Sequence, residues 1–229
     1  MSNLPDKPIC DITRFTTLDF PDRIACIVWF SGCQMRCPYC YNPHMVLGNG
    51  SLSPSDLYDF LRLRQGKLDG VVLSGGECTL YPHLDALCET IKSMGFEIKI
   101  DTNGLRPKTI KTLVESDLVD FISLDYKAPK SKFKTITGTD GFTLLQETLI
   151  YLIKADISFE VRTTVHPDLL SVEDINIIIE DLHNLGFEGN YAIQNYLHVS
   201  PTLGDVGEPK AIFEVGKLKH LIPLQLRNF

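Results

Sequence analysis

Short apolar runs alternate with longer segments of helical periodicity along most of the chain. The short runs are rich in β-branched residues, and the longer segments repeat apolar residues every three to four positions, so strands are expected to alternate with helices. Ser53-Pro54 and Pro107 mark two helix starts, and Gly186 marks a helix end. The expected strands are 25–30, 70–74, 97–101, 119–125, 157–165 and 191–197. The expected helices are 53–64, 82–95, 107–116, 142–155 and 171–185.

This alternation predicts an α/β fold with a parallel sheet and right-handed crossovers. Six β/α units are too few for a closed eight-stranded barrel of about 250 residues. The pattern therefore favours a partial (β/α)6 TIM-like barrel. We expect a single domain over residues 1–229, with a core at about 20–200 and a C-terminal extension at 201–229. The leucines of that extension are expected to pack against the barrel or cover a sheet edge: Leu218, Leu221, Leu224 and Leu226.

The composition is that of an ordinary globular protein, with 229 residues of which 44% are hydrophobic and 22% charged. A net charge of −7 leaves no electrostatic footprint for nucleic acid. Residues 1–8 lack the basic and then apolar order of a signal peptide, and no apolar run approaches the ~20 residues needed to span a bilayer. We therefore expect a cytoplasmic protein without nucleic-acid or membrane partners, whose cysteines are reduced.

Three of the seven cysteines are closely spaced. Cys33, Cys37 and Cys40 form a C-x3-C-x2-C motif directly after the first expected strand. Thiolates select zinc, copper(I) or an iron–sulfur cluster, and closed zinc sites and [4Fe–4S] clusters usually take four protein ligands. A set of three leaves one metal position open, where a substrate could bind. The alternative is a zinc site completed by His44 or a distant cysteine. The other cysteines form no second cluster: Cys10, Cys26, Cys78 and Cys88.

Polar motifs follow the other expected strands, at the edge where parallel α/β proteins bind ligands. Two glycines followed by a glutamate come after the second strand, where glycine lets a backbone approach a ligand closely. Arg162 lies on the same face of the fifth strand as Thr164 and needs an anionic partner, which a ligand, Glu160 or another acid could supply. Read singly, these motifs also fit plain turns, a solvated charge pair and a surface histidine. In chain order they are Gly75-Gly76-Glu77, Asp101-Thr102-Asn103-Gly104, Asp125-Tyr126-Lys127, Arg162 and His198.

The cysteine motif, with Tyr39 before its third cysteine, resembles that of the radical S-adenosylmethionine (SAM) superfamily. The resemblance implies that the three cysteines hold a [4Fe–4S] cluster whose fourth iron binds the amino and carboxylate groups of SAM. It also implies the partial (β/α)6 barrel. Gly75, Gly76 and Glu77 resemble the family's GGE motif, which binds the SAM ammonium group. That motif often continues with proline, and the role of Cys78 at this position stays open.

The motifs after the third and fourth strands resemble those of glycyl-radical-enzyme activases. This resemblance implies that Asp101, Thr102 and Asp125 lie near the SAM carboxylate and could hold a monovalent cation. It also implies that Lys127 contacts SAM and that a histidine after the sixth strand lies near it. The expected SAM-binding residues are thus Tyr39, Gly75, Gly76, Glu77, Asp101, Thr102, Asn103, Asp125, Lys127, Arg162 and His198.

Over residues 10–200 the chain is most similar to activating proteins of anaerobic (class III) ribonucleoside-triphosphate reductases. The resemblance implies reductive cleavage of SAM with an electron from a flavodoxin or ferredoxin, and formation of a glycyl radical on the partner reductase. No side chain of this chain need then act as an acid or base. Two alternatives stay open. One is a small-molecule radical SAM enzyme such as 7-carboxy-7-deazaguanine synthase, and the other is a zinc-binding module without enzymatic activity.

Overall fold

A computed structural model describes residues 7–229 of the chain. The eight strands in this range follow one another in the sheet in chain order. They are β1 Ile9–Thr16, β2 Ala25–Phe30, β3 Gly70–Gly75, β4 Glu97–Thr102, β5 Phe121–Asp125, β6 Ser158–Val165, β7 Tyr191–Asn195 and β8 Leu224–Arg227. The α-helices are α1 Pro43–Leu47, α2 Pro54–Arg62, α3 Leu84–Ser93, α4 Pro107–Glu115, α5 Lys130–Thr137, α6 Phe142–Lys154 and α7 Val172–Asn184. The short 3-10 helices are η1 Cys78–Leu80 and η2 Val215–Lys217.

The described residues divide into two compact units. The first comprises the segments up to Gln34, Asn42–Thr102 and Lys108–Ile122. The second comprises Met35–Tyr41, Asn103–Pro107 and Ser123–Phe229. The single domain expected over residues 1–229, with its core at 20–200 and its extension at 201–229, stays a prediction. Residues 1–6 lie outside the described residues. They belong to the segment 1–8, which lacks the sequence pattern of a signal peptide.

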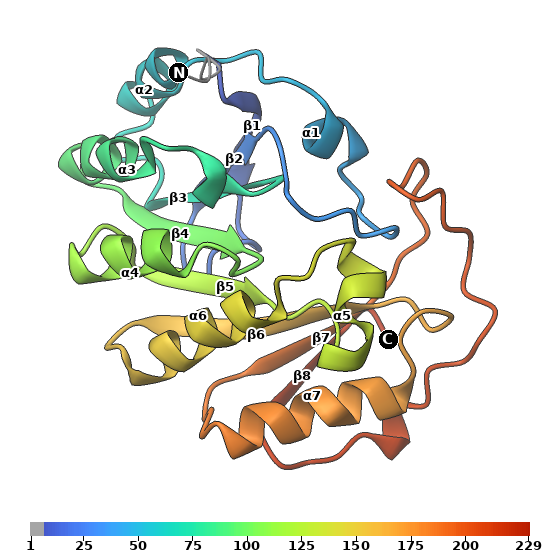
Figure 1. Ribbon diagram of the computed structural model, residues 1–229. Coiled ribbons are helices and arrows are strands. Elements are labelled where there is room, and N and C mark those ends of the chain that lie inside the picture. The colour runs from blue at the N-terminus through green and yellow to red at the C-terminus, as the bar shows by residue number, and fades with distance from the viewer. Residues whose placement is uncertain (1–6) are drawn as a thin grey trace. The chain divides into compact units, whose positions relative to one another are not determined.

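In the first unit, β2, β3 and β4 are parallel and β1 is antiparallel to β2. The register pairs Ala25 with Gly70 and Gly70 with Glu97, so these three parallel strands end at the same edge. Helices α2 and α3 lie alongside β3 and β4 (Figure 1). Helix α2 begins with a capping box, in which Ser53 and Asp56 each bond the other's backbone, and has proline at its first position.

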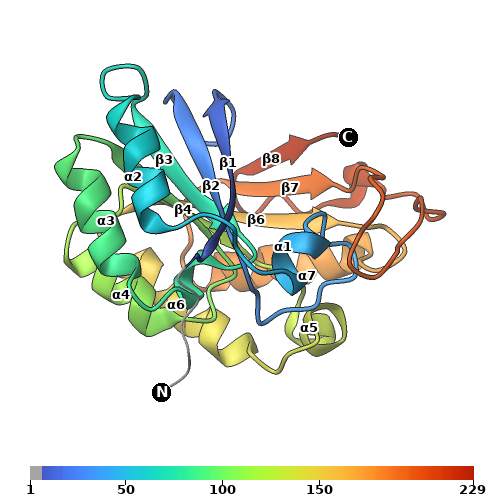
Figure 2. The ribbon, with the colours of Figure 1, turned by 90° about the horizontal axis from the view of Figure 1, so that it is seen from above.

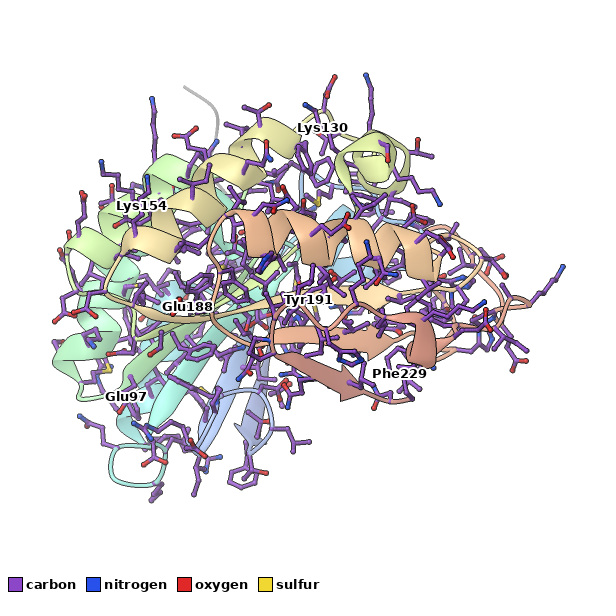
Figure 3. All side chains as sticks on the ribbon, turned by 90° about the horizontal axis from the view of Figure 1, so that it is seen from below. Glu97, Lys130, Lys154, Glu188, Tyr191 and Phe229 are labelled. Atoms are coloured by element: carbon purple, nitrogen blue, oxygen red, sulfur yellow. The ribbon has the colours of Figure 1, made fainter. Side chains whose placement is uncertain are left out.

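In the second unit, β6, β7 and β8 are parallel, and Tyr191 is paired with Val161 on one side and Leu224 on the other. Helix α7 begins with a second capping box, formed by Ser171 and Asp174. It buries three isoleucines and a leucine, and the helix lies beside strands β6 and β7 (Figure 3). Viewed from above, the segment after β7 runs past the carboxyl ends of β6 and β7 before the chain returns to β8 (Figure 2).

The six strands and five helices expected from the pattern are all present, with ends displaced by a few residues, and the predicted α/β fold is confirmed. The pattern missed β1, β8, α1 and α5. Strand β1 is stabilised by the neighbouring strand β2, where the Trp29 indole N–H donates to the Thr13 hydroxyl at 2.8 Å. Strand β8 covers the edge of β7, as expected of the extension, and Leu218 is buried, but Leu221 is exposed and makes no such packing.

Every helix within residues 7–229 is too short or too polar to cross a lipid bilayer.

Candidate functional site

The cysteine loop connects β2 to α1 without a helix or strand of its own. Cys37 is buried, and Cys33 and Cys40 are partly buried. In the second unit the loop forms a turn, closed by the Cys40 N–H donating to the Cys37 carbonyl at 3.1 Å. The Arg36 N–H donates to the carbonyl of Thr137, the last residue of α5, at 2.7 Å. The positions of two predicted cluster ligands therefore depend on a helix that the pattern did not predict.

The C-terminal extension also holds this turn. The Leu203 N–H donates to the Cys40 carbonyl at 3.0 Å, and the Gly204 N–H donates to the Pro38 carbonyl at 2.8 Å. A Cβ at position 204 would lie 2.6 Å from the Pro38 Cβ, so only glycine permits this approach. The extension at 201–229 thus forms part of the support of Cys37 and Cys40.

In the first unit, the two glycines of the Gly75-Gly76-Glu77 turn pack against the protein's own backbone. Gly75 has a φ of +115°, and a Cβ there would lie 2.2 Å from the Phe30 nitrogen. A Cβ at Gly76 would lie 2.1 Å from the Gly32 carbonyl oxygen. The Glu77 N–H donates to that same oxygen at 2.8 Å. The two glycines therefore pack closely against β2 and against the residue that precedes Cys33.

We expect Gly76→Ala to destabilise the chain by about 1–3 kcal/mol, the usual cost of overpacking, because the clash is with backbone atoms that cannot rotate away. The loss should appear in urea unfolding, together with a lower iron content after anaerobic reconstitution. Gly207→Ala is the matched control, since a Cβ there meets nothing within 4 Å and the residue has no positive φ. Equal stability of the two variants would contradict this role of Gly76.

Glu77 is buried, with 2% of its surface exposed, and its carboxylate accepts several hydrogen bonds on one oxygen. Oε1 accepts from the Thr79 N–H at 3.2 Å, from the Thr79 hydroxyl at 2.5 Å and from the Thr102 hydroxyl at 2.8 Å. These hydrogen bonds fix the orientation of the Glu77 carboxylate. The turn after β3 therefore holds an oriented carboxylate at the carboxyl edge of the strands. Thr79 had no signal in the sequence beyond its position two residues after Glu77.

Asp101, at the end of β4, interacts with a buried cation. The Lys99 ammonium forms an ion pair with Asp101 Oδ1, and the Ser74 hydroxyl donates to Oδ2 at 3.1 Å. Lys99 precedes Asp101 by two residues on β4, so both side chains lie on one face of the strand. That alternation was visible in the sequence, but Lys99 was not among the predicted site residues.

Cys78 lies beside the same aspartate and is an inert thiol. Its sulfur donates to the Asp101 carbonyl at 3.7 Å, and burial, reinforced by the charges of Glu77 and Asp101, raises the pKa of the thiol well above its ordinary value. Cys26 and Cys88 are also buried, and burial raises the pKa of each to about 12. A thiol that stays protonated is a poor metal ligand.

In the second unit, Asp125 at the end of β5 has a cation on each oxygen. Arg162 Nε donates to Oδ1 at 2.8 Å, and Lys127 Nζ donates to Oδ2 at 2.9 Å. Burial alone would raise the pKa of Asp125, but the charges of Arg162 and Lys127 outweigh it and hold the pKa well below its usual range. Arg162 therefore finds the anionic partner that its inward position requires, and that partner is Asp125 rather than Glu160.

This ion-pair group is joined to the cysteine loop. The hydroxyl of Tyr39, a buried residue, donates to the Lys127 carbonyl at 3.3 Å. Burial opposes the charge of Lys127, but Asp125 and then Cys37 raise the pKa of its ammonium above the ordinary value. Lys127 therefore places a cation near Cys37.

Asn103 and His198, two further predicted SAM-binding residues, differ in burial: the first is buried and the second is exposed. Asn103 is buried, and its side-chain oxygen accepts from the Leu105 N–H at 3.1 Å in a turn that places Gly104 at a φ of +76°. This segment therefore forms an Asx-type turn. His198 lies in the exposed part of the segment after β7. Its ring makes an edge contact with Tyr196, with centroids 6.5 Å apart.

An aromatic group that the sequence did not reveal lies at the ends of β6 and β7, where His166 and Tyr196 are buried. His166 and Tyr196 have ring centroids 4.7 Å apart, and Tyr196 stacks on Tyr41, the residue after Cys40, at 5.4 Å. His166 Nε2 lies 3.1 Å from the Gly207 carbonyl oxygen. The stack joins the residue that follows the cysteine motif to two strand ends.

The donor chemistry of the loop fits an iron–sulfur cluster, because soft thiolates are its usual ligands. Within residues 7–229, no three His, Cys, Asp or Glu side chains already converge on a common metal position. The joint ligation by Cys33, Cys37 and Cys40 therefore stays a prediction, as do the SAM contacts.

Comparison with known proteins gives concordant results. The family model for the radical SAM superfamily matches residues 27–189. A protein of Methanocaldococcus jannaschii that is named as a glycyl-radical enzyme activating enzyme, MJ1227, is 32% identical over 200 residues, covering 82% of this chain and 79% of its own. The pyruvate formate-lyase-activating enzyme of Streptococcus mutans is 31% identical over 145 residues, covering 57% of this chain and 55% of its own.

Two other similarities are more limited. The 7-carboxy-7-deazaguanine synthase of Neisseria meningitidis serogroup B is 34% identical over 84 residues, which cover 36% of this chain and 37% of that enzyme. Among solved structures, Streptococcus suis SuiB bound to SAM superposes with a TM-score of 0.64 at 16% identity, covering 88% of this chain. This chain spans about half of SuiB, 52% of its length, and the likeness concerns the fold.

Proposed function

Since the chain belongs to the radical SAM superfamily, whose enzymes use a [4Fe–4S] cluster and SAM, we propose that it is a glycyl-radical-enzyme activase. Its proposed partner is an anaerobic class III ribonucleoside-triphosphate reductase, and its electron donor is a flavodoxin or ferredoxin. The observation that carries the proposal is the 32% identity to the M. jannaschii protein along most of both chains. The similarity to a pyruvate formate-lyase-activating enzyme supports the same class of partner.

The residues that would hold the two cofactors are those of the strand ends. Cys33, Cys37 and Cys40 would bind the cluster through their thiolates. Glu77 would accept from the SAM ammonium group, for which a buried carboxylate already oriented by two threonines is a suitable acceptor. When bound, the cluster and SAM supply one-electron cleavage of a carbon–sulfur bond and transfer of one hydrogen atom from a partner glycine, so that methionine, 5′-deoxyadenosine and a glycyl radical are formed.

The chain's own side chains position groups rather than transfer protons. In the second unit, Asp125 is neutralised on both oxygens, so it acts as a rigid acceptor that orients Lys127 and Arg162. Lys127 presents a cation, which would suit a carboxylate of a bound ligand. Buried Tyr39 links the cysteine loop to the backbone of Lys127, just after β5.

The test uses the full chain, reconstituted anaerobically with iron and sulfide, together with SAM, reduced flavodoxin and a purified class III reductase. We expect a glycyl-radical doublet in the electron paramagnetic resonance spectrum of the reductase, and one 5′-deoxyadenosine for each radical formed. A reductase with its radical-site glycine replaced by alanine is the control and should give no doublet. Cleavage of SAM without a radical on the intact reductase would exclude this reductase as the partner. It would leave the assignment of radical SAM chemistry unchanged.

A second candidate is a small-molecule radical SAM enzyme, favoured by the local similarity to 7-carboxy-7-deazaguanine synthase. It predicts formation of 7-carboxy-7-deazaguanine by the reconstituted protein without any protein partner. The zinc-binding module considered from the cysteines alone predicts a colourless protein that holds zinc and no iron. Metal analysis of the reconstituted chain and product analysis by mass spectrometry separate these alternatives from the activase.

A further inference from the structure

Lys99 in the middle of β4 is a charged residue in an interior position. Its side chain is 3% exposed, and that of its ion-pair partner Asp101 is 13% exposed. An ammonium group removed from water needs an anionic partner, because the loss of hydration is otherwise uncompensated. The position of Lys99 is therefore explained by Asp101, and the charge of Asp101 is in turn compensated by Lys99.

The carboxylate of Asp101 is engaged on both oxygens by groups of the first unit. Lys99 binds Oδ1 and the Ser74 hydroxyl donates to Oδ2 at 3.1 Å. The neighbouring Thr102, the other residue here that was expected to bind a monovalent cation, donates its hydroxyl to Glu77 at 2.8 Å. A Na⁺ or K⁺ ion bound to Asp101 would lie within a few ångströms of the Lys99 ammonium, in a low-dielectric surrounding where like charges repel strongly.

The charge of Asp125, the third expected cation ligand, is compensated by two side chains of its own unit. Asp125, in the second unit, binds Arg162 at 2.8 Å through one oxygen and Lys127 at 2.9 Å through the other. Each aspartate, considered within its own unit, thus has a fixed cation supplied by the chain. The carboxylates do not fit the expectation of a bound monovalent ion.

We propose that Lys99 is a built-in counter-ion that positions Asp101, and that the chain consequently binds SAM without a monovalent cation. The inference rests on the proposed function only in requiring that the chain bind SAM. It does not depend on which protein carries the glycine. Lys99 is a positioning residue, because it acts on the ligand through Asp101.

The test is the affinity of the reconstituted chain for SAM, measured by titration calorimetry at one ionic strength in choline chloride, sodium chloride and potassium chloride. The wild-type chain should bind SAM equally in all three salts. Lys99→Met removes the charge but keeps the length of the side chain. This variant should lose about tenfold in affinity in choline and recover it in sodium or potassium, which can then occupy the vacated position beside Asp101.

Lys92→Met is the matched control, because Lys92 also pairs with an aspartate in this unit, Asp120 at 2.7 Å, which accepts from the first half of β4 through the Ile98 N–H. It should bind SAM like the wild type in every salt. If Lys99→Met alone fails to fold, the double variant Lys99→Met, Asp101→Asn has no uncompensated charge and should fold without any salt dependence of SAM binding. Circular dichroism and iron content report folding independently of SAM.

A wild-type affinity that rises about tenfold with sodium or potassium would overturn the inference, as would a salt dependence of the double variant. So would a folded Lys99→Met chain that binds SAM as the wild type does in choline, or that stays weak in every salt. Absence of SAM binding by the wild type in all three salts would instead contradict the proposed function itself.

Discussion

Replacing Cys37 with alanine is expected to remove the iron–sulfur cluster and to reduce SAM cleavage to the uncatalysed background, a loss of roughly 10⁶-fold or more. Cys37 is the buried member of the three loop cysteines, it lies close enough to Lys127 to raise the pKa of that ammonium, and the turn that holds it is fixed by backbone hydrogen bonds. No substitute thiol is available at that place in the turn. The measurements are iron and sulfide per chain after anaerobic reconstitution, and 5′-deoxyadenosine formed with excess dithionite.

Cys88→Ala is the control for this prediction. Cys88 is fully buried in α3, and its raised pKa keeps the thiol protonated, so its removal should leave the iron content unchanged. Cys78→Ala tests the same point closer to the strand ends and should also keep the cluster. Retention of the full cluster by Cys37→Ala, or its loss from Cys88→Ala, would show that the wrong thiols have been assigned.

Asp125→Asn is expected to destabilise the chain by about 3–5 kcal/mol, the usual cost of removing one partner of a buried ion pair. Arg162 and Lys127 would both remain partly buried without their shared carboxylate. Unfolding in urea, followed by circular dichroism, measures the loss. Asp140→Asn is the control in the same unit, because Asp140 is 83% exposed in its pair with Lys134, and the change should stay within about 0.5 kcal/mol.

The same carboxylate predicts a dependence of stability on pH. The folded-state pKa of Asp125 lies well below the unfolded value of about 3.9, so its contribution is complete above that value. The contribution is lost as the pH falls below about 4 toward the lower folded-state pKa. Wild-type unfolding free energy should therefore fall more steeply with acid than that of Asp125→Asn, by up to about 1.4 kcal/mol per pH unit. Parallel pH profiles for the two chains would contradict this assignment.

The loop cysteines are supported by backbone contacts from several parts of the chain. Gly76 and Glu77 hold the start of the loop through Gly32, while α5 and the C-terminal extension hold the turn that contains Cys37 and Cys40. The extension therefore belongs to the support of the proposed centre. Truncation before residue 203 would remove two backbone hydrogen bonds from that turn.

Local patterns determined the regular elements. The apolar run of β2, the helix starts at Ser53 and Pro107, and the helix end at Gly186 are each specified by a few neighbouring residues, so the sequence predicted them. The same holds for the C-x3-C-x2-C motif, because ligand spacing on one loop is a property of the chain itself. Strands β1 and β8 escaped prediction because their stability comes from pairing with distant β2 and β7, not from their own patterns.

By itself the sequence determined the class of fold, the cysteine loop and the order in which polar residues follow the strands. Only the tertiary structure decided the partners of those residues. It pairs Arg162 with Asp125, places Lys99 against Asp101, packs Gly75 against β2 and Gly76 against Gly32, and sets Gly204 against Pro38. The physical reason is that a charge or a close backbone contact is satisfied by whatever the fold brings within a few ångströms, and residues far apart in the chain supply those groups.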